Sequence, residues 1–176
     1  MVATSVVITK DNLFTQLHAN IFNLLNNRTN VPDPARPNDT GTTRTRKFVY
    51  VREPNWSASN FAGFPALVVS DPKHSQNNKT ADSSKAFQTD EFLLTIYAQD
   101  KTSDSDGDAS AGQQIRDITT DIVNTINDNY FTLRNNGLRN SIFDTIDFPE
   151  WGEVDGKPVA KREITLRFSN QLRRIR

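Results

Sequence analysis

The hydrophobic residues of this 176-residue chain recur at two spacings, one typical of helices and one typical of strands. Residues 11–27 place their apolar side chains on one helical stripe, and residues 110–127 do the same around Ile115 and Ile118. Both stripes predict amphipathic helices that lie on a sheet. Phe22 falls well off the first stripe, so it is either exposed or in contact with a partner.

Five segments have the composition of strands, because apolar, β-branched and aromatic residues are bounded there by turn-forming residues. These predicted strands are residues 47–52, 66–70, 91–99, 141–148 and 160–169. The third is apolar on both faces, which predicts a central strand. We expect an α+β fold in which one mixed or mainly antiparallel sheet of four or five strands is packed by two helices. The order is helix, three strands, helix, two strands.

Turn and cap residues separate these elements. Ser110 is the predicted N-cap of the second helix, with Gln113 three residues later as in a capping box. Residues 129–140 are predicted to contain a turn, and Asp155-Gly156 is the predicted tip of a hairpin. The connection between the first two strands contains three aromatic residues that are predicted to cover one end of the core, namely Trp56, Phe61 and Phe64.

Two polar segments interrupt the hydrophobic pattern. Residues 28–46 contain three prolines and a glycine, which exclude a helix or a central strand. This segment is either a solvated connector or an arm that orders only against a neighbour or partner. Residues 71–89 are predicted to form a polar loop with His74 solvated, and the basic end of the chain, residues 170–176, is predicted to fray.

Length and composition favour a single domain, residues 1–176, with a real core. The chain has no cysteine, which excludes disulfides and thiolate zinc sites. Its start has neither the basic region nor the apolar run of a signal peptide, and no apolar stretch is long enough to span a membrane. We therefore expect a soluble protein that is made in a cytoplasm and has no membrane partner.

Charge is distributed unevenly although the net charge is zero. Residues 1–89 have 10 basic and 6 acidic groups, residues 90–155 have 4 and 14, and residues 156–176 have 7 and 1. Either the basic tail folds back beside the acidic middle of its own chain, or basic and acidic faces of neighbouring copies meet in an oligomer.

No segment has the pattern of a reactive site. Asp104, Asp106 and Asp108 resemble a calcium loop, but Ala109 and Ile115 stand where that loop requires glycine and glutamate. An acidic turn that favours the positive N-terminus of the second helix is the better interpretation. The basic tail lacks the interleaved aromatic residues of a dedicated nucleic-acid-binding module, and no nucleotide-binding motif occurs. We predict no catalytic residue, no cofactor and no metal, and hence no enzyme.

The element order, the polar segment after the first helix, the strand FLLTIYAQD leading into the second helix and the final ITLRFSNQLRRI together resemble a tail terminator of long-tailed bacteriophages. Related tail-completion and neck proteins share this plan. The resemblance implies a ring, commonly a hexamer, that sits on the last ring of tail-tube protein and stops its polymerisation. The ring would join the tail to the head connector in the virion, with DNA passing through its lumen without sequence-specific contacts.

The residues assigned to this assembly come from the chain's own charge and hydrophobic pattern. The predicted contacts with other subunits or partners are Phe22, Arg36, Arg44, Arg46, Arg167, Arg173 and Arg174. The predicted acidic groups of the lumen, which would repel passing DNA, are Asp104, Asp106 and Asp108.

Three other functions remain open at this point. The chain is alternatively a head-side neck or tail-completion subunit. It is alternatively a tail or baseplate accessory protein that binds a host-surface carbohydrate through Trp56 and Trp151. The third is a small hydrolase that uses the acidic residues around Trp151.

Overall fold

The computed structural model describes residues 13–77, 85–100, 110–135, 138, 142–154 and 156–173. This part of the chain contains three helices, α1 (Leu13–Asn26), α2 (Ala111–Asp128) and α3 (Tyr130–Asn135). It also contains seven strands in one sheet, namely β1 (Val49–Tyr50), β2 (Ala66–Val69), β3 (Lys73–Asn77), β4 (Lys85–Gln99), β5 (Ile142–Ile146), β6 (Glu150–Val154) and β7 (Lys157–Arg173).

The sheet is built on two long paired strands, β4 and β7, which are far apart in the sequence. These strands pair antiparallel from Lys85 opposite Arg173 to Gln99 opposite Val159. The strand order is β1-β2-β4-β7-β5, with β3 beside β4 and β6 beside β7. Only β1 and β2 are parallel among the described strands. The predicted α+β class with one mixed sheet is confirmed, and so is the central place of the third predicted strand, although the strands and helices are more numerous than expected.

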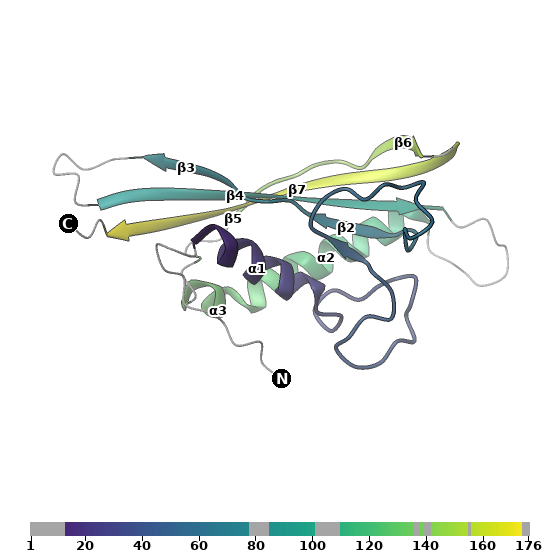
Figure 1. Ribbon diagram of the computed structural model, residues 1–176, viewed down its shortest axis with the longest axis horizontal. Helices are drawn as coiled ribbons and strands as arrows, with labels where there is room; N and C mark the ends of the chain where they lie inside the picture. Colours follow the sequence, from purple (N-terminus) through teal and green to yellow (C-terminus); the bar gives the residue numbers. More distant parts are fainter. Residues whose placement is uncertain are drawn as a thin grey trace.

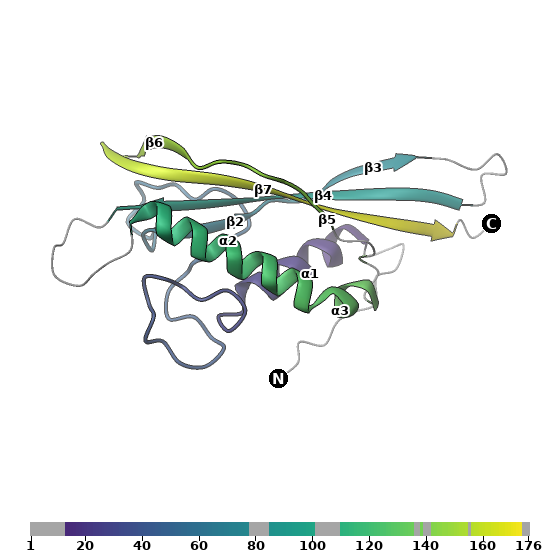
Figure 2. The same ribbon diagram turned by 180° about the vertical axis from the view of Figure 1, so that it is seen from behind.

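All three helices lie on the same side of the sheet (Figures 1 and 2). The apolar stripe of α2 is fully buried at Ile115, Ile118, Ile122 and Ile126 against the core. On the sheet, β4 presents Phe92 and alternate residues to this core, as the two-residue period of a strand requires. Figure 1 shows that β3 and the adjoining ends of β4 and β7 project beyond the helices.

A second, smaller cluster covers the opposite face of the sheet near its β1 edge. Its buried members come from four strands and are Tyr50, Ala66, Val68, Tyr97 and Val159. Trp56, Phe61 and Phe64 pack on this cluster from the connection between β1 and β2. The Trp56 ring lies 5.1 Å from the Phe61 ring and 4.7 Å from the Tyr97 ring. These aromatic residues are packed as predicted, but they cover this second cluster and not one end of the main core.

The predicted cap and hairpin are also present. The Ser110 hydroxyl accepts a hydrogen bond of 3.3 Å from the backbone N–H of Gln113 and thereby caps α2. The carboxylate of Asp100 accepts a second bond from the Ala111 N–H at 2.6 Å. Val154 pairs with Lys157 across the hairpin tip, where Gly156 has a φ of 72°.

The prediction that residues 71–89 form a polar loop is wrong. Residues 73–77 form β3, and the same segment contributes the first residues of β4. The backbone of β3 pairs with β4 from Lys73 opposite Glu91 to Asn77 opposite Phe87. Polar side chains on a projecting sheet leave no hydrophobic alternation in the sequence, so the usual signal of a strand was missing.

The structure differs from the sequence prediction at two further elements. Residues 130–135 form α3 just after α2, where only a turn was predicted, and Leu133 of this helix is buried in the core. Strand β7 continues to Arg173, so residues 170–173 do not fray as predicted. In both cases tertiary contacts stabilise a segment whose own sequence pattern is weak. Burial of Leu133 does so for α3, and pairing with β4 does so for the end of β7.

Candidate subunit interface

Arg46 is the most heavily bonded of the predicted interface residues, and its bonds are all inside the subunit. Its guanidinium forms a bidentate pair with Asp33, with Nε donating to Oδ2 at 2.5 Å and Nη2 donating to Oδ1 at 2.8 Å. The Asp33 side chain is only 2% exposed. Arg46 also donates to the carbonyls of Ala62, Gly63 and Pro65. It therefore ties residues 28–46 to the β1–β2 connection.

Arg44 binds the C-terminal end of α1 in a similar way. It donates to the carbonyl oxygens of Leu25, Asn26 and Val31 at 3.1, 2.9 and 2.6 Å. Two of these carbonyls belong to the last turn of the helix, where backbone acceptors have no partner inside the helix. Burial lowers the pKa of Arg44 to about 10, with the Asp33 carboxylate acting in the opposite direction.

The polar segment 28–46 is therefore folded against its own subunit. Residues 36–38 and 40–43 of the segment are exposed, so its interpretation as a solvated connector or as a partner-binding arm stays a prediction. Arg44 and Arg46 bind groups of their own chain, and their assignment to a subunit interface stays a prediction. Arg36 is exposed and stays available for one.

The basic final strand also meets acidic groups of its own chain. Arg167 of β7 donates to Asp144 at 2.8 Å and to Glu91 at 3.3 Å. The basic tail thus does lie beside the acidic middle of the same chain at Arg167, whose assignment to a subunit interface stays a prediction. Arg173 lies in β7 opposite Lys85, and Arg174 is outside the described residues.

Phe22 is partly buried rather than exposed. It packs against the main core cluster, and its ring stacks on His18 with a centroid separation of 5.8 Å. His18 in turn contacts the carbonyl of Val69 at 3.0 Å, so this pair closes the gap between α1 and β2.

The predicted lumen residues Asp104, Asp106 and Asp108 lie outside the described residues, so their assignment stays a prediction. The part of the chain that the structure describes contains no group of acidic or histidine side chains able to hold a metal ion. His74 is not solvated as predicted, because its Nδ1 lies 2.5 Å from Oδ1 of Asp90, whose side chain is fully buried. This pair joins β3 to β4 at the base of the projecting end of the sheet.

One edge of the sheet has an exposed apolar surface that the sequence analysis did not assign to subunit contacts. Strands β5 and β6 both flank β7, and neither has a second strand partner among the described residues. Ile146, Phe148 and Trp151 are 44%, 90% and 59% exposed. We call residues 142–154 the β5–β6 edge. Its composition was visible in the sequence, but only the topology shows that it is an outer edge.

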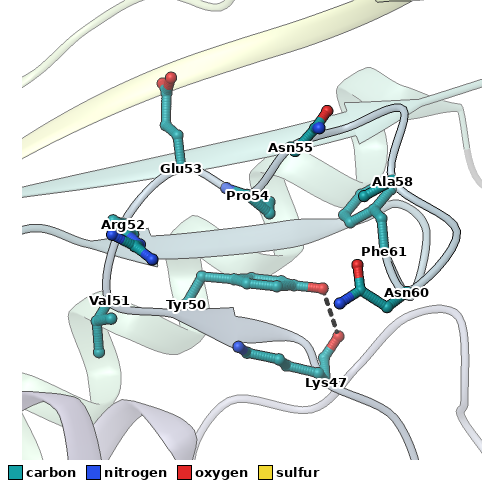
Figure 3. A pocket seen from close by; sticks show the side chains of 10 residues that line it. All are labelled: Lys47, Tyr50, Val51, Arg52, Glu53, Pro54, Asn55, Ala58, Asn60 and Phe61. Atoms are coloured by element: carbon teal, nitrogen blue, oxygen red, sulfur yellow. Dashed lines mark hydrogen bonds between the residues drawn. The ribbon is translucent and has the colours of Figure 1, made fainter.

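The opposite edge of the sheet contains a hollow. Residues 47–52, which we call the β1 edge, border a hollow of about 690 Å³ that continues along residues 53–61 (Figure 3). Tyr50 and Phe61 provide aromatic surface to its lining. Figure 3 shows Lys47 and Arg52 on the β1 side of the hollow, with Asn55 and Asn60 on the connection that faces it.

The wall of the hollow is held to the sheet by Glu53. Its carboxylate accepts a hydrogen bond from the hydroxyl of Tyr97. Burial, together with this bond and the charge of Glu53, raises the pKa of Tyr97 well above its ordinary value. The Lys47 ammonium lies 4.7 Å from the centroid of the Tyr50 ring, a cation–π contact beside the entrance.

No protein-family model matches this chain, and a search of curated proteins gives no match. None of the helices that the structure describes has the length and apolarity to cross a membrane. The geometry of the described surfaces is therefore the basis for the function proposed below.

Proposed function

We propose that this chain is a structural subunit of a phage tail, and specifically a tail terminator that closes into a ring on the end of the tail tube. The ring, a hexamer, stops tube polymerisation and joins the tail to the head connector. DNA passes through its lumen. The observation that supports this proposal best is the unpaired β5–β6 edge with its exposed aromatic residues.

An exposed sheet edge with large apolar side chains is uncommon in a protein that stays monomeric. Strand edges are open to pairing with another chain, and proteins usually protect them with charge, distortion or a covering segment. Phe148 and Trp151 are 90% and 59% exposed on this edge and lie three positions apart in the chain. Contiguous apolar groups with a polar surround mark interaction surfaces.

The fold suits such an assembly. Its helices cover only one face of the sheet, and both outer edges are formed by short strands (Figure 2). A ring needs a heterologous contact, in which one surface of a subunit binds a different surface of its neighbour. Repetition of this contact gives a ring when the rotation between neighbours closes. Two opposite edges of one sheet provide two such surfaces.

The proposal is tested by adding the purified chain to tail-tube protein encoded by the same phage while the tubes polymerise. Tube length and tube ends are measured by electron microscopy. We expect shorter tubes whose ends have a ring of this chain, and tubes that lengthen unchanged without any bound chain would contradict the proposal. The double variant Phe148→Ser and Trp151→Ser is the matched control and should leave tubes uncapped.

A second candidate function is favoured by the exposed Trp151. An exposed indole beside carboxylates such as Glu150 is a surface on which a sugar ring can stack, and this would suit a tail accessory protein that binds host carbohydrate. Trp56, the other residue considered for this role, is packed among Phe61, Phe64 and Tyr97. Titration of the chain with host-surface polysaccharide distinguishes this function, because a terminator should give no binding heat.

A further inference from the structure

The β5–β6 edge is acidic as well as apolar. Between residues 144 and 154 the chain has four acidic residues and no lysine or arginine. The four are exposed, and they are Asp144, Asp147, Glu150 and Glu153. Asp144 bonds Arg167 of its own subunit and Glu150 lies opposite Lys161 of β7, while Asp147 and Glu153 flank the exposed aromatic residues in the chain.

The β1 edge is basic and concave. Residues 47–52 contain Lys47 and Arg52 and no acidic residue, and Glu53, the next residue, lines the hollow with its carboxylate bound to the Tyr97 hydroxyl. Lys47 and Arg52 are exposed, and Val51 between them is 49% exposed. The surface beside them is concave, since the hollow of about 690 Å³ opens there over Tyr50 and Phe61 (Figure 3). Pockets of roughly 300–1,000 Å³ hold whole small-molecule ligands, so this hollow has room for an aromatic side chain.

We propose that the β5–β6 edge of one copy docks on the β1 edge of the next copy, with Trp151 or Phe148 entering the hollow beside Lys47 and Arg52. This inference rests on the proposed ring function, and it identifies the partner of each edge as a second copy of this chain. Protruding aromatic groups meet a concave aromatic lining, and an acidic surface meets a basic one.

The charges also disfavour the simplest competing contact. Two β6 strands pairing with each other across a twofold axis would bring Glu150 and Glu153 of both copies together. Like charges directly opposite each other on paired strands are destabilising. A contact between unlike edges avoids this repulsion, and it leaves the bound pair with one free β1 edge and one free β5–β6 edge. Such a contact propagates from copy to copy and closes as a ring when the rotation permits.

The test uses cysteine cross-linking, which is clean in this chain because it has no native cysteine. Gly152→Cys labels the β5–β6 edge, where an added Cβ meets no atom within 4 Å, and Asn60→Cys labels the exposed rim of the hollow. The variant with both cysteines is treated with a short bismaleimide and separated under denaturing conditions. We expect a ladder of covalent oligomers that ends at the ring number.

Single-cysteine variants and a displaced pair are the controls. Gly152→Cys alone and Asn60→Cys alone should stay monomeric on the denaturing gel, because each contact then contains only one of the two cysteines that a cross-link needs. Gly152→Cys combined with Asn124→Cys, on the exposed face of α2, should also give no ladder. A dimer from Gly152→Cys alone would indicate twofold pairing of β6 and would overturn the inference.

Charge reversal provides a second, independent measurement. Lys47→Glu with Arg52→Glu should abolish assembly, and so should Glu150→Lys with Glu153→Lys, each by loss of every species above the monomer in native mass spectrometry. Mixing the two variants should restore rings of alternating subunits, because every contact is then acidic against basic. Mixtures that stay monomeric would contradict the proposed pairing of edges.

The outcomes separate this inference from the proposed function. Wild-type rings without the cross-linked ladder would overturn the pairing of these two edges and leave the terminator function standing. A wild-type chain that stays monomeric, alone and on tail tubes, would overturn both.

Discussion

At the scale of single residues, the ion pair of Arg46 and Asp33 has the largest expected effect on stability. The two side chains are 10% and 2% exposed, and the guanidinium also satisfies three backbone carbonyls. Such a pair is costly to break from one side only, because the remaining charge stays buried without compensation.

We predict that Arg46→Ala lowers the free energy of unfolding by about 3–5 kcal/mol, since the buried carboxyl group of Asp33 is left without its partner. Urea denaturation followed by circular dichroism measures the change. Arg36→Ala removes the same side chain from an exposed position of the same segment and should change stability by less than about 0.5 kcal/mol. A loss of under about 1 kcal/mol for Arg46→Ala would show that the pair is not buried as described.

Tyr97 makes stability depend on pH in the alkaline range. Its pKa in the folded chain is raised above the ordinary value of 10.0, by burial first and then by Glu53. The folded state therefore keeps the phenolic proton at pH values where the unfolded chain releases it. The contribution of Tyr97 to the free energy of unfolding is therefore fully present below about pH 10, and it is lost as the pH rises further.

We predict that Tyr97→Phe weakens this alkaline loss of stability. The urea midpoint of the wild type and the variant is compared between about pH 8 and about pH 11. The wild-type midpoint should fall more steeply than that of the variant above about pH 10, because only the wild type has this proton to release. Parallel curves would show that Tyr97 does not titrate differently in the two states.

At the scale of elements, the part of the fold that could be predicted is the part with a hydrophobic period. The stripe of α2 and the apolar faces of residues 91–99 led to the correct class and the correct central strand. By contrast, β3 and the first residues of β4 are polar, and their strand structure depends on pairing with neighbouring strands. No local pattern records that pairing.

The candidate site was less predictable than the fold, for a related reason. Arg44 and Arg46 were assigned to an interface because they stand in a polar, proline-rich segment. Their acceptors are the Asp33 carboxylate and the Val31 carbonyl of the same segment, together with carbonyls of α1 and of the β1–β2 connection, and sequence spacing does not reveal those contacts. The exposed edge at Trp151 likewise depends on which strands are neighbours in the sheet.

The projecting end of the sheet provides a prediction about an element. Asp90→Ala removes the buried partner of His74 and should loosen β3 from β4. We expect the backbone amides of residues 73–77 to exchange hydrogen faster by at least about tenfold, the equivalent of about 1.4 kcal/mol, while β2 stays protected. Hydrogen exchange read by mass spectrometry measures this.

Glu91→Ala is the matched control for that experiment. Glu91 is the next residue of β4, and its side chain is 35% exposed in its ion pair with Arg167. Exposed pairs of this kind contribute about 0–1 kcal/mol. Equal exchange in the two variants would contradict a special role for the buried carboxylate.

At the scale of the whole molecule, the two outer edges of the sheet differ in charge and in shape. The β5–β6 edge has exposed aromatic residues among acidic groups, and the β1 edge has a hollow beside basic groups. A subunit with two unlike, complementary edges is suited to head-to-tail assembly, which is the geometry of a ring.

This arrangement predicts that assembly can be removed without unfolding the subunit. Phe148→Ser with Trp151→Ser should abolish oligomers and leave the melting temperature of the monomer within a few degrees, because both side chains are mostly solvated in the monomer. Sedimentation velocity and thermal denaturation measure the two quantities on the same sample. Oligomers that persist in this variant would show that another surface holds the subunits together.

The mass of the wild-type assembly tests the central claim most directly. Native mass spectrometry of the purified chain, alone and after incubation with tail-tube protein, counts the copies of the 19.9 kDa subunit in each species. We predict one closed species of fixed copy number, six subunits, with no series of intermediate sizes. A chain that is monomeric under both conditions, or one that forms an open-ended series of sizes, would contradict a ring-forming terminator.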